Sequence, residues 1–105
     1  MTDSVKNAPV FGGRVSPRTR SRLVVIGSST GGPQALQTVI TALPENFPCP
    51  VIVVQHMPAG FTGALAGRLH GVSQVNVREA QDKEILEPGC VYIAPGNYHL
   101  RILHE

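Results

Sequence analysis

A short apolar run that leads directly into a glycine-rich turn constrains the fold of this chain more than any other feature. Residues 23–26 read Leu-Val-Val-Ile, of which three are β-branched, and this run predicts a buried strand. A turn follows over residues 27–32, and Pro33 then opens a segment with apolar residues at positions 36, 39, 40 and 43. That spacing predicts a helix over residues 32–43.

The turn also carries a motif with a chemical meaning. Residues 27–31 fit the pattern G-x-S-x-G, and only Ser29, not Ser28, has glycine at both two-residue offsets. In a nucleophile elbow the crowded backbone needs those glycines, and the serine hydroxyl stands beside free N–H groups at the helix N-terminus. A βα turn that binds phosphate has a similar composition. The motif alone therefore leaves both interpretations open.

A second buried strand is expected at residues 51–55, and His56 follows it. Two parallel strands joined by a helix form a βαβ unit, and ligands bind at the edge where such strands end. Adjacent strands lie about 5 Å apart, so His56 could reach Ser29 as its general base. A structural loop histidine is the alternative interpretation of His56, and His99 is the second candidate base.

A carboxylate that would orient the imidazole is harder to find. Asp82 is the one aspartate beyond the first 22 residues, and it stands in the charged segment 79–87, where we expect exposure to solvent. Cys49 and Cys90 lack the spacing of a zinc site and are expected to be free thiols in a reducing compartment. The sequence therefore predicts a serine–histidine pair without a third member, and no metal.

The rest of the chain alternates between short apolar runs and turns. We expect a helix over residues 61–70 that buries Phe61, Leu65 and Leu69 and ends at Gly71. Further strands are expected around residues 75–77, near an edge of the sheet, and at 90–94. Residues 99–103 are expected to return as the antiparallel partner of 90–94.

Composition and charge restrict the class of protein. The 105 residues are 42% hydrophobic and 15% charged, which suits one small globular domain. Neither a run of 18 apolar residues nor a signal-peptide h-region is present, so no membrane span or export signal is expected. Residues 1–22 carry five Lys or Arg against one Asp and are predicted to be a linker or disordered basic arm. The sequence has no stripe of basic and aromatic residues, so we expect no nucleic-acid partner.

Three motifs together resemble a known family, the chemotaxis protein-glutamate methylesterases of the CheB type, over about residues 22–103. They are the Gly-Ser-Ser-Thr-Gly-Gly turn at 27–32, Gln-His-Met-Pro-Ala-Gly-Phe-Thr at 55–62, and Tyr-Ile-Ala-Pro-Gly-Asn-Tyr-His at 92–99. The resemblance implies Ser29 as nucleophile and His56 as base, with Thr30, Gly31 and Met57 lining the substrate and oxyanion site. It places the catalytic aspartate past residue 105.

The resemblance also implies the activity and its setting. The expected reaction is hydrolysis of glutamate methyl esters on the cytoplasmic helices of chemoreceptors, with deamidation of some glutamines, and no cofactor is implied. A receiver domain of two-component signalling is expected upstream, and the expected compartment is the cytoplasm. The predicted fold is α/β, a three-layer, doubly wound, mostly parallel sheet, with residues 23–105 as the N-terminal part of an incomplete catalytic domain. The alternative is an anion- or phosphate-binding α/β module without catalysis.

Overall fold

The computed structural model describes residues 10–15, 22–28, 32–55, 57–58, 60–96 and 99–103. Its centre is a four-stranded sheet with the order β2-β3-β6-β4. The strands are β2 (Val24–Ser28), β3 (Val51–Gln55), β6 (Cys90–Ile93) and β4 (Asn76–Glu79). Each neighbouring pair is parallel. The mostly parallel sheet is therefore confirmed, as are the adjacency of the first two strands and the edge position of the strand that contains Val77.

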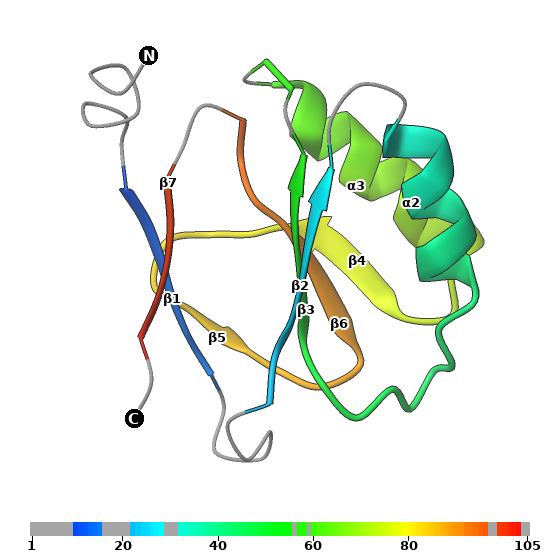
Figure 1. Cartoon of the computed structure of the whole chain (residues 1–105), viewed down its shortest axis with the longest axis horizontal. Coiled ribbons are helices and arrows are strands. Elements are labelled where there is room, and N and C mark those ends of the chain that lie inside the picture. Colours follow the sequence, from blue (N-terminus) through cyan, green and yellow to red (C-terminus); the bar gives the residue numbers. More distant parts are fainter. Residues whose placement is uncertain are drawn as a thin grey trace.

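Two helices, α2 (Gly32–Thr41) and α3 (Phe61–Val72), cover the same face of this sheet. They lie side by side on the right of Figure 1, beside β4. Their buried residues form one apolar cluster with the strand residues of that face: Leu36, Ile40, Val51, Val53, Leu65, Ala66, Leu69, Val75, Val77, Val91 and Ile93. Because side chains alternate across a strand, Val51 and Val53 of β3 and Val91 and Ile93 of β6 belong to this cluster. The α/β fold class is confirmed.

The opposite face of the sheet carries a smaller cluster. Ile52 and Tyr92 pack there with Ala80 and Leu86. Further along the same face, Val25 and Val54 remain 59% and 40% exposed. The helices of the described residues thus cover one face of the sheet, and the other face is only partly covered.

A second sheet consists of β1 (Val10–Val15), β5 (Glu84–Leu86) and β7 (His99–Leu103), in the order β5-β1-β7 with parallel pairs. In Figure 1, β1 and β7 lie on the side away from the helices. The expectation of an arm without regular structure is wrong for residues 10–15, while the division of the chain at residue 22 stays a prediction. Two glycines in the middle of β1 weaken its strand signal.

The predicted pairing of residues 99–103 is also wrong. They form β7, but β7 pairs in parallel with β1 instead of returning along β6. A local turn signal at Pro95 and Gly96 favours a hairpin, whereas the strand that β7 meets lies more than 80 residues earlier in the chain. Residues 84–86, which belong to the charged segment 79–87 that was expected to be exposed, form β5, and Leu86 is buried.

Helix α3 differs from its prediction in which residues it buries. The buried positions are Thr62, Leu65, Ala66 and Leu69, and Phe61 is 58% exposed. The predicted burial of Leu65 and Leu69 is confirmed, and that of Phe61 is wrong. In the first turn of the helix the buried position is one residue later, at Thr62. The helix continues past Gly71 to Val72 and is capped by Ser73. Neither helix in the described part of the chain has the length and apolar character needed to span a bilayer.

Candidate active site

The carboxyl ends of β2 and β3 meet at one edge of the sheet. The two strands pair in register from Val24 with Val51 to Ser28 with Gln55. Ser29 and His56 are the residues that follow this last pair in the sequence, and both lie outside the described residues, as do Thr30 and Gly31. The structure therefore confirms that these two chain positions follow neighbouring strand ends, while the geometry of the predicted pair stays a prediction.

Gly27, two residues before the predicted nucleophile Ser29, has open surroundings. A Cβ atom built at Gly27 would meet no heavy atom within 4 Å among the described residues. The crowding expected at this position thus does not come from the described part of the chain.

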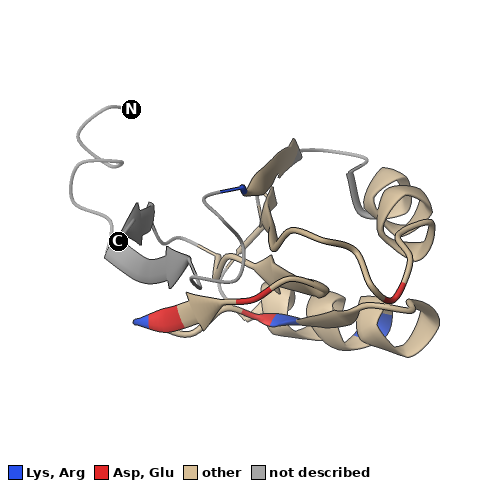
Figure 2. Ribbon diagram, turned by 90° about the horizontal axis from the view of Figure 1, so that it is seen from below, with Lys and Arg blue, Asp and Glu red and all other residues tan. Residues whose placement is uncertain are grey.

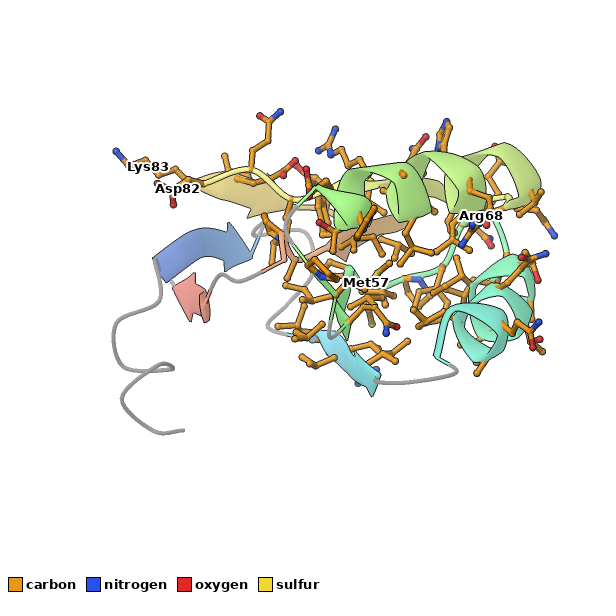
Figure 3. All side chains as sticks on the ribbon, turned by 90° about the horizontal axis from the view of Figure 1, so that it is seen from above. Met57, Arg68, Asp82 and Lys83 are labelled. Carbon is orange, nitrogen blue, oxygen red and sulfur yellow. The ribbon has the colours of Figure 1, made fainter. Side chains whose placement is uncertain are left out.

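Met57 is the one predicted site residue that the structure describes. Its side chain is half-buried and packs against the apolar cluster beneath α3, and Figure 3 shows it in the interior between the strands and the helices. The connection that follows is tight: the Phe61 N–H donates to the Pro58 carbonyl at 3.2 Å, and Gly60 has φ 94°. Glycine suits this left-handed conformation. Met57 and Pro58, the described residues of this loop before Gly60, are thus held by core packing and by this hydrogen bond.

A buried hydroxyl joins three elements at the same edge of the sheet. Thr62 in the first turn of α3 is fully buried, and its Oγ1 donates to Oε2 of Glu79 at the end of β4. The same oxygen accepts a hydrogen bond from the Gly96 N–H at 3.1 Å. Gly96 lies in the segment that follows β6. The sequence motifs do not indicate this junction; its one sequence signal is a threonine directly after the apolar residue that starts the predicted helix.

The segment at Gly96 also touches the loop that follows β3. A Cβ atom at Gly96 would lie 2.6 Å from the Met57 carbonyl oxygen and 2.7 Å from that of Pro58. Only a residue without a side chain allows the two backbones to approach so closely. The loops that follow β3 and β6 are therefore packed against each other directly after position 56.

The other candidate side chains lie elsewhere. Asp82 is exposed in the turn between β4 and β5, and Figure 3 shows it with Lys83 at the tip of that turn, far from Met57. His70 is exposed on α3, and its Nδ1 accepts a hydrogen bond from the Val77 N–H at 3.1 Å. The backbone of His99 begins β7, and His104 lies outside the described residues.

The described residues also show how the possible metal ligands and the charged side chains are distributed. Among them, no group of three or more His, Cys, Asp or Glu side chains is arranged to hold a metal ion. Cys49 and Cys90 are free thiols. Figure 2 shows acidic and basic residues interspersed along β4, β5 and the turn between them.

The chain is similar in sequence to known proteins over the region that contains this edge of the sheet. The family model described as CheB methylesterase matches residues 24–104, which include both strand ends and the Gly96 segment. The chain belongs to the CheB methylesterase family. The similar CheB-family proteins named protein-glutamate methylesterase/protein-glutamine glutaminase include one from Halalkalibacterium halodurans, 58% identical over 74% of this chain, and one from Thermotoga maritima, 57% identical over 80%.

A solved CheB structure has the same fold. The crystal structure of the Thermotoga maritima CheB methylesterase catalytic domain matches 71% of this chain with a TM-score of 0.70 and 60% sequence identity. The match covers 40% of that catalytic domain. This chain spans 22% and 24% of the length of the two curated CheB relatives, or about a quarter.

Proposed function

We propose that this chain contributes the nucleophile and the general base of a protein-glutamate methylesterase. The observation that carries the proposal is the pairing of Ser28 with Gln55, because Ser29 and His56 are each the next residue along the chain. Consecutive Cα atoms are 3.8 Å apart, so both residues start from one edge of the sheet. The CheB relatives carry the name of an enzyme with this activity, which supports the proposal.

In the proposed reaction, the Ser29 hydroxyl attacks the carbonyl carbon of a glutamate methyl ester while His56 accepts its proton. Backbone N–H groups of the turn at Thr30 and Gly31 stabilise the oxyanion, and Met57 lines the site. His56 then protonates the departing methoxide, which leaves as methanol. Water, deprotonated by His56, hydrolyses the resulting glutamyl ester of Ser29. Attack on a glutamine side chain releases ammonia by the same steps, and neither route requires a cofactor.

We do not assign Asp82 as the acid that orients the imidazole, since it lies exposed in the turn between β4 and β5. The family resemblance places that aspartate beyond residue 105. The proposed substrates are methylated cytoplasmic helices of chemoreceptors, so the proposed compartment is the cytoplasm. A receiver domain upstream is proposed as the regulatory partner in two-component signalling.

A fluorophosphonate reagent tests the proposal, because it reacts with activated serine hydroxyls. We expect the 105-residue chain to be labelled at Ser29, as located by peptide mass spectrometry. Ser29→Ala should eliminate labelling, and His56→Gln should slow it by about 10²-fold or more, the usual contribution of a general base. Ser28→Ala is the matched control and should be labelled at the unaltered rate.

Two outcomes would contradict this proposal. Labelling that persists in Ser29→Ala would remove Ser29 from its role. Tight binding of inorganic phosphate without any labelling would instead support an anion-binding turn, the alternative that the names of the relatives do not favour.

A further inference from the structure

The hydrogen bonds of Thr62 suggest a role that the proposed reaction does not assign to it. We propose that Thr62 is a positioning residue, which holds the loop that begins at His56 through the Gly96 segment. This inference rests on the proposed function, because it concerns the placement of the proposed general base. It is carried by the contacts among Thr62, Glu79 and Gly96 and by the close approach of Gly96 to the residues after His56.

The Thr62 hydroxyl uses both its donor and its acceptor capacity. It donates to the Glu79 carboxylate and accepts from the Gly96 N–H, and the residue is 0% exposed. Water cannot replace either partner at such a site without rearrangement, so an unmade hydrogen bond there is costly. The orientation of the hydroxyl is thus defined by two partners from elements distant in sequence.

Glu79 connects this junction to the edge strand. Its Oε2 accepts from Thr62, and its Oε1 would lie 3.5 Å from a Cβ atom at Gly63, so the carboxylate lies along the first turn of α3. A negative charge is favourable beside the N-terminal turn of a helix. Glu79 is therefore the second partner that holds the Thr62 hydroxyl, in addition to the Gly96 N–H.

The Gly96 segment transmits this restraint to the loop after β3. Its N–H is bound by Thr62, and a Cβ atom at Gly96 would lie only 2.6 and 2.7 Å from the carbonyl oxygens of Met57 and Pro58. Met57 is bonded directly to His56. A displacement of the Gly96 segment would thus release the backbone on which His56 is placed, and a misplacement of about 1 Å can cost about 10²-fold in rate.

The test compares Thr62→Val, which removes the hydroxyl while keeping the shape, with Thr62→Ser, which keeps the hydroxyl. Thr38→Val is the matched control, because the Thr38 hydroxyl bonds only within α2, to the Gln34 carbonyl. Three quantities are measured on the full chain: hydrogen exchange of the Gly96 amide, the NMR resonances of the His56 ring, and the rate of fluorophosphonate labelling at Ser29.

In Thr62→Val we expect the Gly96 amide to exchange at least about tenfold faster, as the loss of one hydrogen bond implies. The Ala94 amide, bonded to the Val53 carbonyl at 2.8 Å, is the internal reference and should keep its rate. The His56 resonances should shift, and labelling of Ser29 should slow at least tenfold. Thr62→Ser should restore most of each effect, and Thr38→Val should produce none.

A merely structural role would lower the free energy of unfolding and speed Gly96 exchange, but it would leave the His56 resonances and the rate of Ser29 labelling unchanged while the protein is folded. Ile40→Val, which removes one core methyl group far from the junction, is the control for lost stability. If Thr62→Val does not fold, Glu79→Ala removes the other partner of the hydroxyl and should shift the same His56 resonances and speed Gly96 exchange.

Failures of the two proposals are distinguishable. An unlabelled parent chain would refute the proposed function, while the His56 resonances and Gly96 exchange still decide the positioning role. A labelled parent chain with unchanged His56 resonances in Thr62→Val would overturn the positioning role and leave the proposed function standing. Unchanged Gly96 exchange would overturn it as well.

Discussion

At the residue scale, Gly96 has the least space for a side chain among the seven glycines whose surroundings the structure describes. A Cβ atom there would approach two backbone oxygens to 2.6 and 2.7 Å, and neither belongs to a flexible side chain. We therefore expect Gly96→Ala to lower the free energy of unfolding by about 1–3 kcal/mol, the usual cost of overpacking. Urea denaturation followed by far-UV circular dichroism measures this loss.

Gly67 provides the opposite case in the same protein. It lies within α3, is exposed, and a Cβ atom there would meet nothing within 4 Å. Gly67→Ala should raise the free energy of unfolding by up to about 1 kcal/mol, because alanine has the higher helix propensity. If both alanine variants changed stability in the same direction, the close approach at Gly96 would not be the cause.

At the scale of elements, His70 joins the last turn of α3 to the edge of β4. Its Nδ1 accepts the Val77 N–H, a group that an edge strand would otherwise leave without a partner in the sheet. We expect His70→Ala to cost about 1 kcal/mol of stability and to accelerate hydrogen exchange of the Val77 amide. Native-state exchange followed by NMR measures both effects.

Arg68 is the control for this element because it lies exposed on the same helix. Arg68→Ala should leave Val77 exchange unchanged. An equal acceleration in both variants would mean that α3 frays as a whole, and that the imidazole does not specifically protect the strand edge.

At the scale of the whole molecule, Tyr92 connects the two sheets. It is fully buried in β6, and its hydroxyl accepts from the Glu87 N–H at 2.9 Å and donates to the Ile85 carbonyl of β5 at 3.5 Å. Burial raises the pKa of Tyr92 to about 12 from an ordinary 10.0. Between these two values the unfolded chain has lost the phenolic proton and the folded chain retains it.

Stability should therefore be fully retained below pH 10 and should fall as the pH rises from 10 to about 12. The expected decrease is about 3 kcal/mol, since the pKa rises by about two units and each unit corresponds to about 1.4 kcal/mol. Tyr92→Phe should be less stable at neutral pH by about 1–3 kcal/mol, because the Glu87 N–H loses its acceptor. Its stability should decline less steeply above pH 10 in urea titrations. Parallel declines in the two proteins would assign the effect to other groups.

The part of the fold that was predictable from the sequence is the part encoded by local patterns. The β-branched run at 51–54 and the following Gln55 form β3 with the predicted bounds. The apolar spacing after Pro33 forms α2, two residues shorter than expected. Alternation within β3 and its parallel pairing with β2 follow from the same patterns. Because parallel strands end at one edge, the sequence also predicted that positions 29 and 56 would follow neighbouring strand ends.

By itself, then, the sequence determined the buried strands, the helices between them and the edge at which Ser29 and His56 begin, because periodicity and turn residues act between near neighbours. The tertiary structure decided which distant segments meet. It paired β7 with β1, buried Thr62 in place of Phe61, and brought Glu79 and Gly96 to the Thr62 hydroxyl. The residues bonded to Thr62 lie 17 and 34 positions away from it in the chain. Local sequence patterns act over shorter separations, so they do not determine whether Phe61 or Thr62 is buried in the core.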